Sequence, residues 1–335
     1  MKCSSQTEGN GHAMEMKQPP PELLDISFVI VNWNTKGLLM DCLRSVFDTV
    51  KGLDFEVWVV DNASEDGSAE AVAELYPQVN LIKNQTNRGF AAANNQAFKF
   101  MKGRYGLLLN SDAALTPGAV NQLYRFMEKT PGAGMACGQL LNPDGTLQNS
   151  FAPFPCFWTV LFNESLLRLI LPHRFPPKTA GGDRPLPVDS CIGACMIVRR
   201  TAMERVGFFD EGFFFFLEET DWAYRMRKEG WEIYFVPSAR IFHHQGASIG
   251  INARGRMMFY RSRYLYLRKW HPRLAAAAPF LISVRLAVNA ILNLAAVLLT
   301  LGLNKSFRRR LFVYLELVRW HLAGCPQPPS PGGKS

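Results

Sequence analysis

The sequence lacks acidic residues over a long interval near its carboxyl end. Residues 233–315 contain no Asp or Glu but thirteen Lys and Arg, so this segment carries a charge of +13 within a chain whose total is +9. Such a concentration of positive charge is typical of proteins that bind nucleic acid or an anionic lipid surface. The sequence contains no RNA-binding or helix-turn-helix signature, and we therefore expect no nucleic-acid partner.

Paired cysteines are also absent from the sequence. The seven cysteines show no CxxC spacing, which indicates reduced thiols in a cytosolic protein and neither a disulfide framework nor a zinc site. Residues 1–22 lack both periodicity and the apolar core of a signal peptide, so we expect a disordered amino-terminal lead there. Residues 326–335 are expected to form a disordered tail.

Long apolar runs are scarce, and the one of note lies inside the basic segment. It covers residues 286–303, which is 18 residues and just within the roughly 17–25 that can span a bilayer. Asn289 and Asn293 interrupt it and Arg285 abuts it, so a helix lying in or shallowly inserted into an anionic membrane surface is favoured over a span. A helix packed on the core of the protein remains the alternative. The basic residues expected to hold anionic headgroups are Arg254, Arg256, Arg261, Arg263, Arg268 and Lys269.

Short apolar runs alternate with amphipathic segments between residues 26 and 237. Repeated strand–helix–strand units predict an α/β fold with a doubly wound, mostly parallel sheet flanked by helices. In the last helix, Thr116 is a candidate N-cap and Pro117 a candidate first residue. The expected strands are 28–32, 56–61, 79–83 and 105–110, and the expected helices lie near 37–49, 66–76, 90–102 and 117–129.

Polar residues cluster where the predicted strands end. Parallel strands point their carboxyl ends to one edge of the sheet, and doubly wound sheets bind ligands beyond that edge. Each polar group alone is typical of a turn, but four polar ends beside such apolar strands indicate a binding site. The four ends are Asn32-Trp33-Asn34-Thr35, Asp61-Asn62-Ala63-Ser64, Asn87-Arg88-Gly89 and Asn110-Ser111-Asp112.

A second cluster follows the apolar run at 213–216, which is expected to form a buried strand. Glu218, Glu219 and Asp221 come shortly after it. A carboxylate delivered to the mouth of a site by a strand can act as a general base, whereas the acidic first turn of a solvated helix is the plainer alternative. If a helix starts near Glu218, Asp221 pairs with Arg225 and takes a structural role, and Glu219 lies on another face.

Six motifs in order give the chain a resemblance to a known family. They are VIVNWNT (29–35), VDNASEDGS (60–68), NRGFAAANN (87–95), LNSDA (109–113), GACMIVRR (193–200) and GFFDEGFFFFLEETDWAYRMRKEGW (207–231). Such a set is more specific than a single glycine-rich loop. In it the sequence resembles the rhamnosyltransferase-like branch of the family-2 glycosyltransferases. The resemblance implies a GT-A fold over residues 23–250, a nucleoside-diphosphate sugar donor, a divalent cation (Mg²⁺ or Mn²⁺) and inverting transfer to a hydroxyl group. Residues 251–325 would form a basic, apolar, membrane-associating helical extension.

The matching motifs assign the donor and the cation to particular residues. Asp61 matches the acid that contacts the base or ribose of the donor, and Asp112 matches the last acid of a DxD-type element that holds a cation on the diphosphate. Asn110 replaces the first acid of that element, which weakens the metal site because hard cations prefer charged oxygen ligands. His243 matches a histidine that completes the metal or diphosphate site. The residues expected to bind the donor are Asn32, Asn34, Asp61, Asn62, Ser64, Asn87, Gly89, Asn95, Asn110, Ser111, Asp112, Gly193 and Ala194.

The resemblance also implies that Glu219 is the general base. It stands where the family usually has the Asp of a Glu-Asp pair, and Glu keeps the carboxylate while lengthening its arm. Glu219 would take the proton of the acceptor hydroxyl while the cation neutralises the departing nucleoside diphosphate. The proline-rich residues 150–187 stand where the family has a variable insert that faces the acceptor.

Three function classes remain open on the sequence. The first is a glycosyltransferase, peripheral or monotopic at the cytoplasmic face of the inner membrane, that transfers a sugar such as rhamnose from dTDP to a lipid-linked or cell-surface glycan. The second is a processive polysaccharide synthase, which would carry a Gln-x-x-Arg-Trp element; the nearest match, at 316–320, begins with Glu. The third is a non-catalytic nucleotide-sugar-binding or scaffold protein, in which Glu219 and Asn110 would mark a lost activity.

Overall fold

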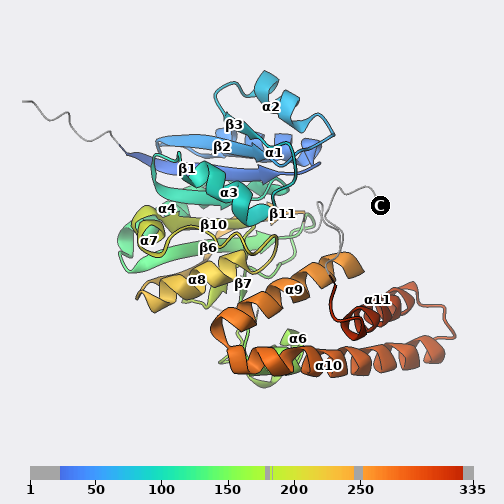
Figure 1. Cartoon of the computed structure of the whole chain (residues 1–335). Coiled ribbons are helices and arrows are strands. Elements are labelled where there is room, and N and C mark those ends of the chain that lie inside the picture. Colours follow the sequence, from blue (N-terminus) through green and yellow to red (C-terminus); the bar gives the residue numbers. More distant parts are fainter. Residues whose placement is uncertain (1–22, 178–181, 183, 245–251, 327–335) are drawn as a thin grey trace, which may run out of the picture.

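The computed structural model describes residues 23–177, 182, 184–244 and 252–326. The expected amino-terminal lead, and all but the first residue of the expected tail, lie outside these residues. Figure 1 shows a β-sheet with helices on both faces and, beneath it, a separate group of helices from the end of the described chain.

Parallel and antiparallel strands both contribute to the main sheet. Its nine strands are β1 (Leu24–Asn32), β2 (Phe55–Asp61), β3 (Asn80–Lys83), β4 (Gly103–Leu109), β5 (Ala113–Leu115), β6 (Ala133–Leu141), β8 (Leu186–Pro187), β10 (Cys195–Arg199) and β11 (Glu232–His243). The run β3-β2-β1-β4 is parallel, which confirms the strands predicted from the apolar runs. β10 pairs antiparallel with β4 and β6, and β6 pairs parallel with β11. A second, two-stranded sheet pairs β7 (Phe151–Ala152) with β9 (Ser190–Cys191).

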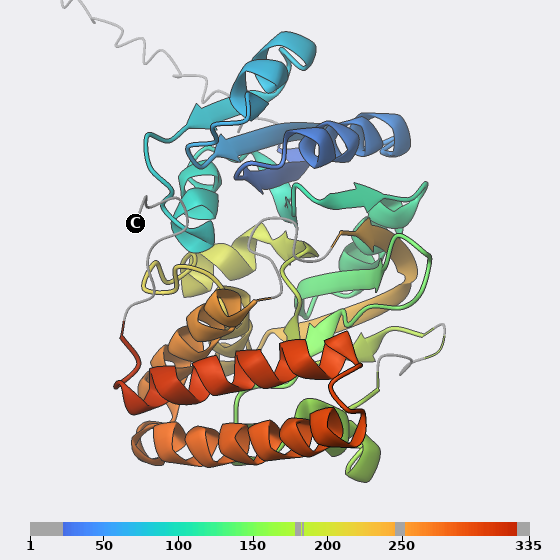
Figure 2. The same cartoon turned by 90° about the vertical axis from the view of Figure 1, so that its right-hand side faces the viewer.

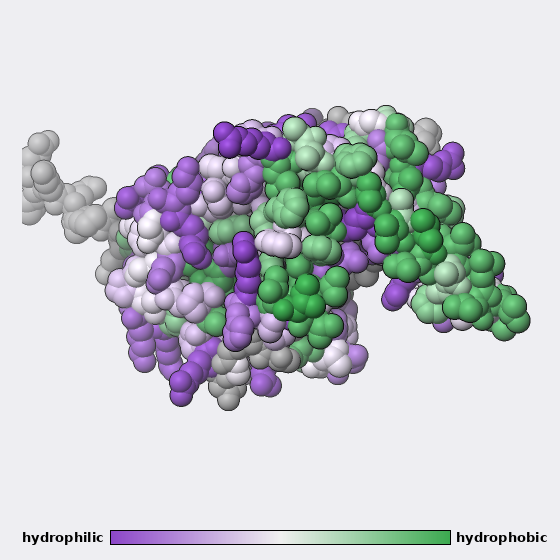
Figure 3. All heavy atoms as spheres, turned by 90° about the horizontal axis from the view of Figure 1, so that it is seen from below, coloured by the Kyte–Doolittle hydropathy of each residue, from purple (hydrophilic) through white to green (hydrophobic). Residues whose placement is uncertain are grey.

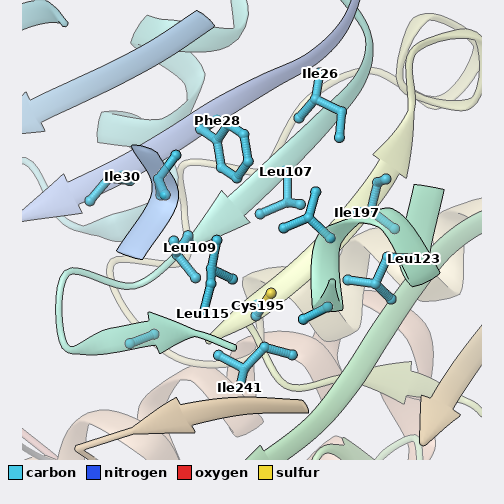
Figure 4. Packing of buried hydrophobic residues seen from close by; sticks show 14 of the residues in the cluster. Ile26, Phe28, Ile30, Leu107, Leu109, Leu115, Leu123, Cys195, Ile197 and Ile241 are labelled. Atoms are coloured by element: carbon cyan, nitrogen blue, oxygen red, sulfur yellow. The ribbon is translucent and has the colours of Figure 1, made fainter. Parts of the chain in front are cut away.

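Alternate side chains of the central strands are buried on opposite faces of the main sheet. Ile26, Phe28 and Ile30 of β1 pack into one core cluster, whereas Val29 packs into the other. One face is covered by α1 (Lys36–Thr49), α2 (Ser68–Leu75) and α4 (Ala119–Lys129), and the other by α3 (Phe90–Phe98), α7 (Arg200–Val206) and α8 (Glu218–Lys228). Burial on both faces explains why these strands are continuous apolar runs. Figure 4 shows the first cluster, where strand side chains meet Leu123 of α4.

Two local predictions are wrong, each because a residue adopts left-handed backbone. Thr116 does not cap α4, since Gly118, with φ 79°, precedes a helix that begins at Ala119. The Thr116 hydroxyl instead donates to the carbonyl of Arg240 at 2.7 Å. Residues 213–216 form a turn and no strand, and Phe216 has φ 70°, which is incompatible with extended backbone.

A third hydrophobic core joins the helices at the end of the described chain. It is formed by α9 (Ala253–Trp270), α10 (Pro272–Leu299) and α11 (Lys305–Leu322), together with Val160 of α5 (Phe157–Leu161). α6 (Glu164–Ile170) follows α5 in the chain. Figure 2 shows α10 and α11 lying side by side. The helix α10 starts earlier and ends earlier than the apolar run predicted at 286–303.

Asp221 links these helices to the sheet domain. Its side chain is fully buried and accepts hydrogen bonds from Arg225 Nε at 2.9 Å and from Trp270 Nε1 at 2.8 Å. Lys269 Nζ lies 2.9 Å from the same carboxylate. The predicted pairing of Asp221 with Arg225, and with it a structural role, is confirmed.

We expect Asp221→Asn to lower the free energy of unfolding by about 3 kcal/mol, because the substitution removes a fully buried charge that two partly exposed cations share. Urea titration of the full chain measures this. Asp41→Asn is the matched control, since its ion pair with Arg44 is exposed on both sides, and a change within about 0.5 kcal/mol is expected there. Equal effects of the two substitutions would contradict the role of Asp221.

Candidate active site

Strand ends meet at one edge of the sheet, as the parallel pattern predicted. β1 and β2 end in register, and Asn32 Nδ2 donates to Asp61 Oδ1 at 3.1 Å. Thr35 Oγ1 lies 2.7 Å from Asn32 Oδ1 and 2.9 Å from the hydroxyl of Ser111, which follows β4. These buried contacts hold the ends of β1, β2 and β4 together.

The same polar groups also shape the turns that follow the strands. Asp61 Oδ2 accepts from the backbone N–H of Ser64 at 2.9 Å. The Ser64 hydroxyl in turn accepts from the backbone N–H of Asn34 at 3.0 Å. Asn34 Oδ1 accepts from the N–H of Glu65 at 2.7 Å. These residues are therefore turn residues and candidate site residues at once, because the side chains that build the turns also line this edge of the sheet.

Asn62 organises the loop between β3 and α3. Its Nδ2 donates to Asn87 Oδ1 at 3.1 Å and to the carbonyl of Gly89 at 3.2 Å. Its Oδ1 accepts from the N–H of Arg88 at 3.2 Å. Gly89 has φ 82°, and a Cβ there would lie 2.5 Å from the carbonyl oxygen of Phe214, so glycine is required for this close approach.

Asn95 is placed differently from the other predicted donor residues. Its Nδ2 donates to the carbonyl of Phe209 and to Glu211 Oε1, both at 3.0 Å. Its Oδ1 accepts from the N–H of Phe209 at 3.1 Å. The side-chain amide is thus occupied in tying α3 to the turn that precedes α8, which is a positioning role.

A carboxylate and an imidazole face each other beyond β4 and β11. His243 Nε2 lies 3.3 Å from Asp112 Oδ1, and both side chains are buried. His243 Nδ1 lies 2.9 Å from Gln148 Oε1. Gln148 Nε2 donates to the carbonyl of His243 at 2.6 Å and to Asn142 Oδ1 at 2.8 Å. Because these bonds orient the Gln148 amide with its oxygen toward the ring, the hydrogen-bond network assigns the imidazole proton to Nδ1.

This arrangement fits a divalent cation. With the proton on Nδ1, the Nε2 lone pair of a neutral His243 points at a carboxylate oxygen, and two such acceptors in contact need a shared cation or proton. The amide of Asn110 reaches the same place, 3.5 Å from His243 Nε2. Within the described residues, no group of three His, Cys, Asp or Glu side chains gathers. Asp112 and His243 would therefore hold the cation with oxygens of substrate and water as the remaining ligands.

Glu218 and Glu219 begin α8 as two buried carboxyl groups. Each has one oxygen without a hydrogen-bond partner among the described residues. Burial raises the pKa of Glu219 to about 7. Burial, together with repulsion from Glu219, raises the pKa of Glu218 well above its usual value. One carboxyl of the pair is therefore poised to lose or accept a proton near neutral pH.

Gly193 and Ala194 lie between the carboxyl pair and the cation residues. The carbonyl of Ala194 accepts from the N–H of Asn110 at 2.9 Å. A Cβ added to Gly193 would lie 3.9 Å from Cγ of Glu219 and 3.9 Å from the ring of Phe90. The structure thus brings the predicted base and the predicted cation residues to opposite sides of one short turn.

Backbone strain is concentrated directly before the carboxyl pair. Phe216 and Leu217 have φ 70° and 65°, and left-handed backbone in bulky residues costs roughly 1–3 kcal/mol each. The turn is held in place by the carbonyl of Phe214, which accepts from the N–H of Phe90 at 2.8 Å. The hydroxyl of Ser262 in α9 donates to the carbonyl of Phe215 at 2.7 Å. Strain of this kind is common at functional sites.

Gln148 and Thr35 were not among the predicted site residues. Thr35 belongs to the first polar strand end, and its position there was the signal that could have identified it. Gln148 follows a turn, Asn142-Pro143-Asp144-Gly145, that the sequence shows plainly. Its contact with His243 joins residues 95 positions apart, and nothing in the local pattern predicts that pairing.

Comparison with known proteins places these features in a family. Residues 27–207 match the sequence model of glycosyl transferase family 2. An N-acetylglucosaminyl-diphospho-decaprenol L-rhamnosyltransferase of Mycobacterium tuberculosis is 30% identical over 234 residues, which cover 64% of this chain and 75% of that protein. A low-salt glycan biosynthesis hexosyltransferase of Haloferax volcanii is 25% identical over 210 residues, which cover 61% of this chain and 62% of that protein.

Solved structures share the fold. A mannosyltransferase from Pyrobaculum calidifontis, in complex with GDP-mannose and Mn²⁺, has a TM-score of 0.55 at 18% identity and covers 91% of each chain. A structure of a GalNAc-transferase with UDP, GalNAc and Mn²⁺ has a TM-score of 0.51 at 16% identity and covers 73% of this chain and 50% of that one. The predicted GT-A architecture is confirmed.

We expect Gln148→Met to weaken binding of Mn²⁺ about 10–100-fold, because loss of the hydrogen bond to Nδ1 releases the ring orientation and the tautomer of His243. Calorimetric titration with Mn²⁺ in the presence of a nucleoside diphosphate measures this. Gln122→Met, on the exposed side of α4, is the matched control and should bind Mn²⁺ like the parent chain. Unchanged affinity in Gln148→Met would remove His243 from the cation site.

Proposed function

This chain belongs to glycosyl transferase family 2 and is a glycosyltransferase of the nucleotide-sugar-dependent kind, and we propose that it transfers rhamnose, with inversion, to a hydroxyl of a lipid-linked glycan. The observation that carries the proposal is the buried Glu219, whose pKa is raised to about 7. It lies on one side of the turn at Gly193 and Ala194, and Asp112 and His243 lie on the other side. The rhamnose and the lipid-linked acceptor come from the similarity to the Mycobacterium tuberculosis rhamnosyltransferase.

The donor is proposed to lie along the edge formed by β1, β2 and β4. Asp61 and the turn at Asn62 to Ser64 would face the nucleoside, and the loop at Asn87 to Gly89 would border it. Asp112 and His243 would hold a divalent cation, which neutralises charge on the diphosphate as it leaves. Asn95 supports the site from behind through its bonds to the 209–211 turn.

Glu219 is proposed to take the proton of the acceptor hydroxyl. The hydroxyl oxygen then attacks the anomeric carbon while the bond to the diphosphate breaks, so one displacement inverts the configuration without a covalent enzyme intermediate. Glu218 and the Cys191 thiol are the other titratable groups that interact with Glu219. Burial, and repulsion from Glu219, raise the pKa of Glu218 well above its usual value, whereas the pKa of Glu219 is about 7; we therefore assign the proton-accepting role to Glu219.

We expect Glu219→Gln to lower turnover about 10²–10⁴-fold, because the amide cannot accept the proton of the acceptor. Donor binding, measured by calorimetry, should be unchanged. For the parent chain, kcat/KM should rise with pH through about 7, since Glu219 acts only after it has lost its proton and its pKa lies there.

Glu218→Gln is the matched control for this prediction. It removes a carboxyl one residue away, and we expect turnover to persist with the same lower pH limit, because it is burial that raises the pKa of Glu219. Normal turnover in Glu219→Gln with loss in Glu218→Gln would assign the base to the other carboxyl. Absence of any transfer or donor hydrolysis in the parent chain would favour a non-catalytic binding protein.

An apolar face on the helical part supports the proposal of a membrane-bound acceptor. Figure 3 views the molecule from below and shows hydrophobic residues gathered across this side. α10 is long and apolar enough to cross a membrane, yet only 17% of its most apolar 18-residue stretch is buried. The exposed apolar residues of α10 and α11 include Phe280, Val284, Val288, Ile291, Leu292, Leu298, Leu299, Phe312, Leu315 and Leu322.

The packing of α10 favours a helix that lies in the membrane surface. One side of α10 is buried through Ala278, Ile282 and Leu286 against α9 and α11. α11 lies along it and carries a run of arginines at 308–310. A spanning α10 would draw these charges toward the hydrocarbon, where each is costly. An in-plane helix leaves them at headgroup level.

The structure corrects the set of basic residues expected at the surface. Arg263 is 5% exposed, and Lys269 is bonded to Asp210 and Asp221. Neither side chain is free to hold a headgroup at the surface. The exposed basic residues near α10 are Arg268, Arg273, Lys305, Arg308, Arg309 and Arg310.

We expect the full chain to float with phosphatidylglycerol vesicles at low salt and to lose much of that binding at high salt, because charge and apolar burial act together. The double substitution Ile291→Glu with Leu298→Glu should abolish flotation. Leu75→Glu, which changes an equally exposed leucine on α2, should not. If the parent chain stays unbound at low salt, the acceptor is a soluble glycan and the membrane proposal fails.

A further inference from the structure

Arg263 is a buried cation without a counter-ion. Its side chain lies at the centre of α9 and is 5% exposed. Its Nε is fully buried and has no hydrogen-bond partner among the described residues. The guanidinium carbon lies 6.0 Å from the ring of Phe259. Burial, and repulsion from Arg285, lower the pKa of Arg263 to about 10.

Arg285 adds a second guanidinium beside the first. It donates to the carbonyls of Thr159 and Phe162, at the end of α5, at 3.0 and 3.2 Å. It also donates to the hydroxyl of Tyr260 at 3.1 Å. These partners are neutral, and Arg285 Nε is buried without a partner among the described residues. The two positive charges therefore lie together with no carboxylate bonded to either.

The nearest acid does not neutralise this pair. Glu164 acts on Arg263 only at a distance, and its carboxylate lies 3.6 Å from Arg168, toward solvent. An uncompensated buried cation destabilises a fold, because water no longer solvates the charge and nothing replaces the water. Elsewhere in the described chain even a partly exposed arginine of α8, Arg225, is matched by Asp221. The contrast indicates that the Arg263–Arg285 pair is complete only with an anion bound.

The apolar surroundings of the pair indicate what kind of anion this is. The pair lies where α9, α10 and the end of α5 meet. The helices α5, α6 and α10 expose apolar side chains. Their exposed apolar residues are Phe157, Trp158, Leu166, Leu169, Ile170, Phe280, Val284 and Val288.

We propose that Arg263 and Arg285 form a binding site for the phosphate groups of a prenyl-phosphate or prenyl-diphosphate lipid, with the hydrocarbon chain of that lipid lying on the apolar side chains of α5, α6 and α10. Guanidinium groups match phosphate oxygens in charge and in two-pronged geometry. The inference rests on the proposed function in taking this lipid to be the carrier of the acceptor glycan. In this inference, Arg263 and Arg285 bind the phosphate groups of the carrier lipid. Glu219, at a separate place, acts on the sugar hydroxyl.

Farnesyl diphosphate in detergent micelles is the probe, and binding to the full chain is measured by calorimetry. We expect Arg263→Gln to weaken binding about 10–100-fold, because two or more charged hydrogen bonds are lost. Arg263→Lys should weaken it less, since charge is kept and only the fork is lost. Arg44→Gln removes the same charge from an exposed position of α1 and should bind like the parent chain.

Thermal unfolding separates a ligand site from a structural role. Without ligand, Arg263→Gln should melt at the same temperature as the parent chain or higher, because an uncompensated buried charge is removed. With farnesyl diphosphate, the parent chain should gain stability and Arg263→Gln should gain less. A lower melting temperature without ligand, together with unchanged affinity, would overturn the inference and make Arg263 structural.

Three further ligands test which part of the lipid the site recognises. Inorganic pyrophosphate and phosphatidylglycerol micelles should each bind more weakly than farnesyl diphosphate, and farnesol should not bind through Arg263. Equal affinity for pyrophosphate would mean a free-phosphate site, and equal affinity for phosphatidylglycerol would mean a general headgroup site; either overturns the lipid carrier. If binding depends on Arg263 but no sugar is transferred, the proposed function fails and this site stands. If transfer to a lipid acceptor occurs with the same KM in Arg263→Gln, the site fails and the function stands.

Discussion

The buried carboxylate of Asp221 ties α8, which begins with Glu218 and Glu219, to the end of α9. It follows Glu219 by two residues in α8 and accepts from Trp270 and Lys269 at the end of α9. Arg225, bonded to the same carboxylate, donates to backbone carbonyls of the turn before α8. One side chain therefore holds the start of α8, which carries Glu219, against the end of α9. For the base that we propose, this attachment matters because small misplacements of reacting groups lower the rate steeply.

Two pairs of titratable side chains, one acidic and one basic, have buried polar atoms without hydrogen-bond partners among the described residues. Glu218 and Glu219 lie at the start of α8 and have raised pKa values, and Arg263 and Arg285 lie between α9 and α10. Perturbed titratable groups of this kind cluster at functional sites. A carboxyl with a raised pKa can accept a proton, and guanidinium groups can hold phosphate. The proposed roles of the two pairs therefore concern the sugar hydroxyl and the phosphate of one lipid-linked acceptor.

The sequence predicted best those features that depend on local pattern. The parallel strands were visible as apolar runs, because helices bury both faces of the sheet. Helical spacing predicted that Asp221, and not Glu219, pairs with Arg225, and the ion pair between Asp221 and Arg225 confirms this. The left-handed turn at Phe216 was not predicted, since four consecutive phenylalanines favour a strand and only contacts with α3 and α9 impose the turn. Gln148 and the burial of Arg263 depend on contacts between distant segments, which no local pattern contains.

The replacement of the usual Asp by Glu219 is accommodated by the structure around it. Glu carries one more methylene, and a carboxyl on a longer arm needs space that a well-packed core does not offer. Gly193 lies beside it, and a methyl group there would make only ordinary van der Waals contact with Cγ of Glu219, at 3.9 Å. The left-handed residues Phe216 and Leu217 turn the chain directly before α8. Backbone strain and a buried carboxyl with a raised pKa are both common at functional sites. Their coincidence at the start of α8 supports the proposal that Glu219 is the base.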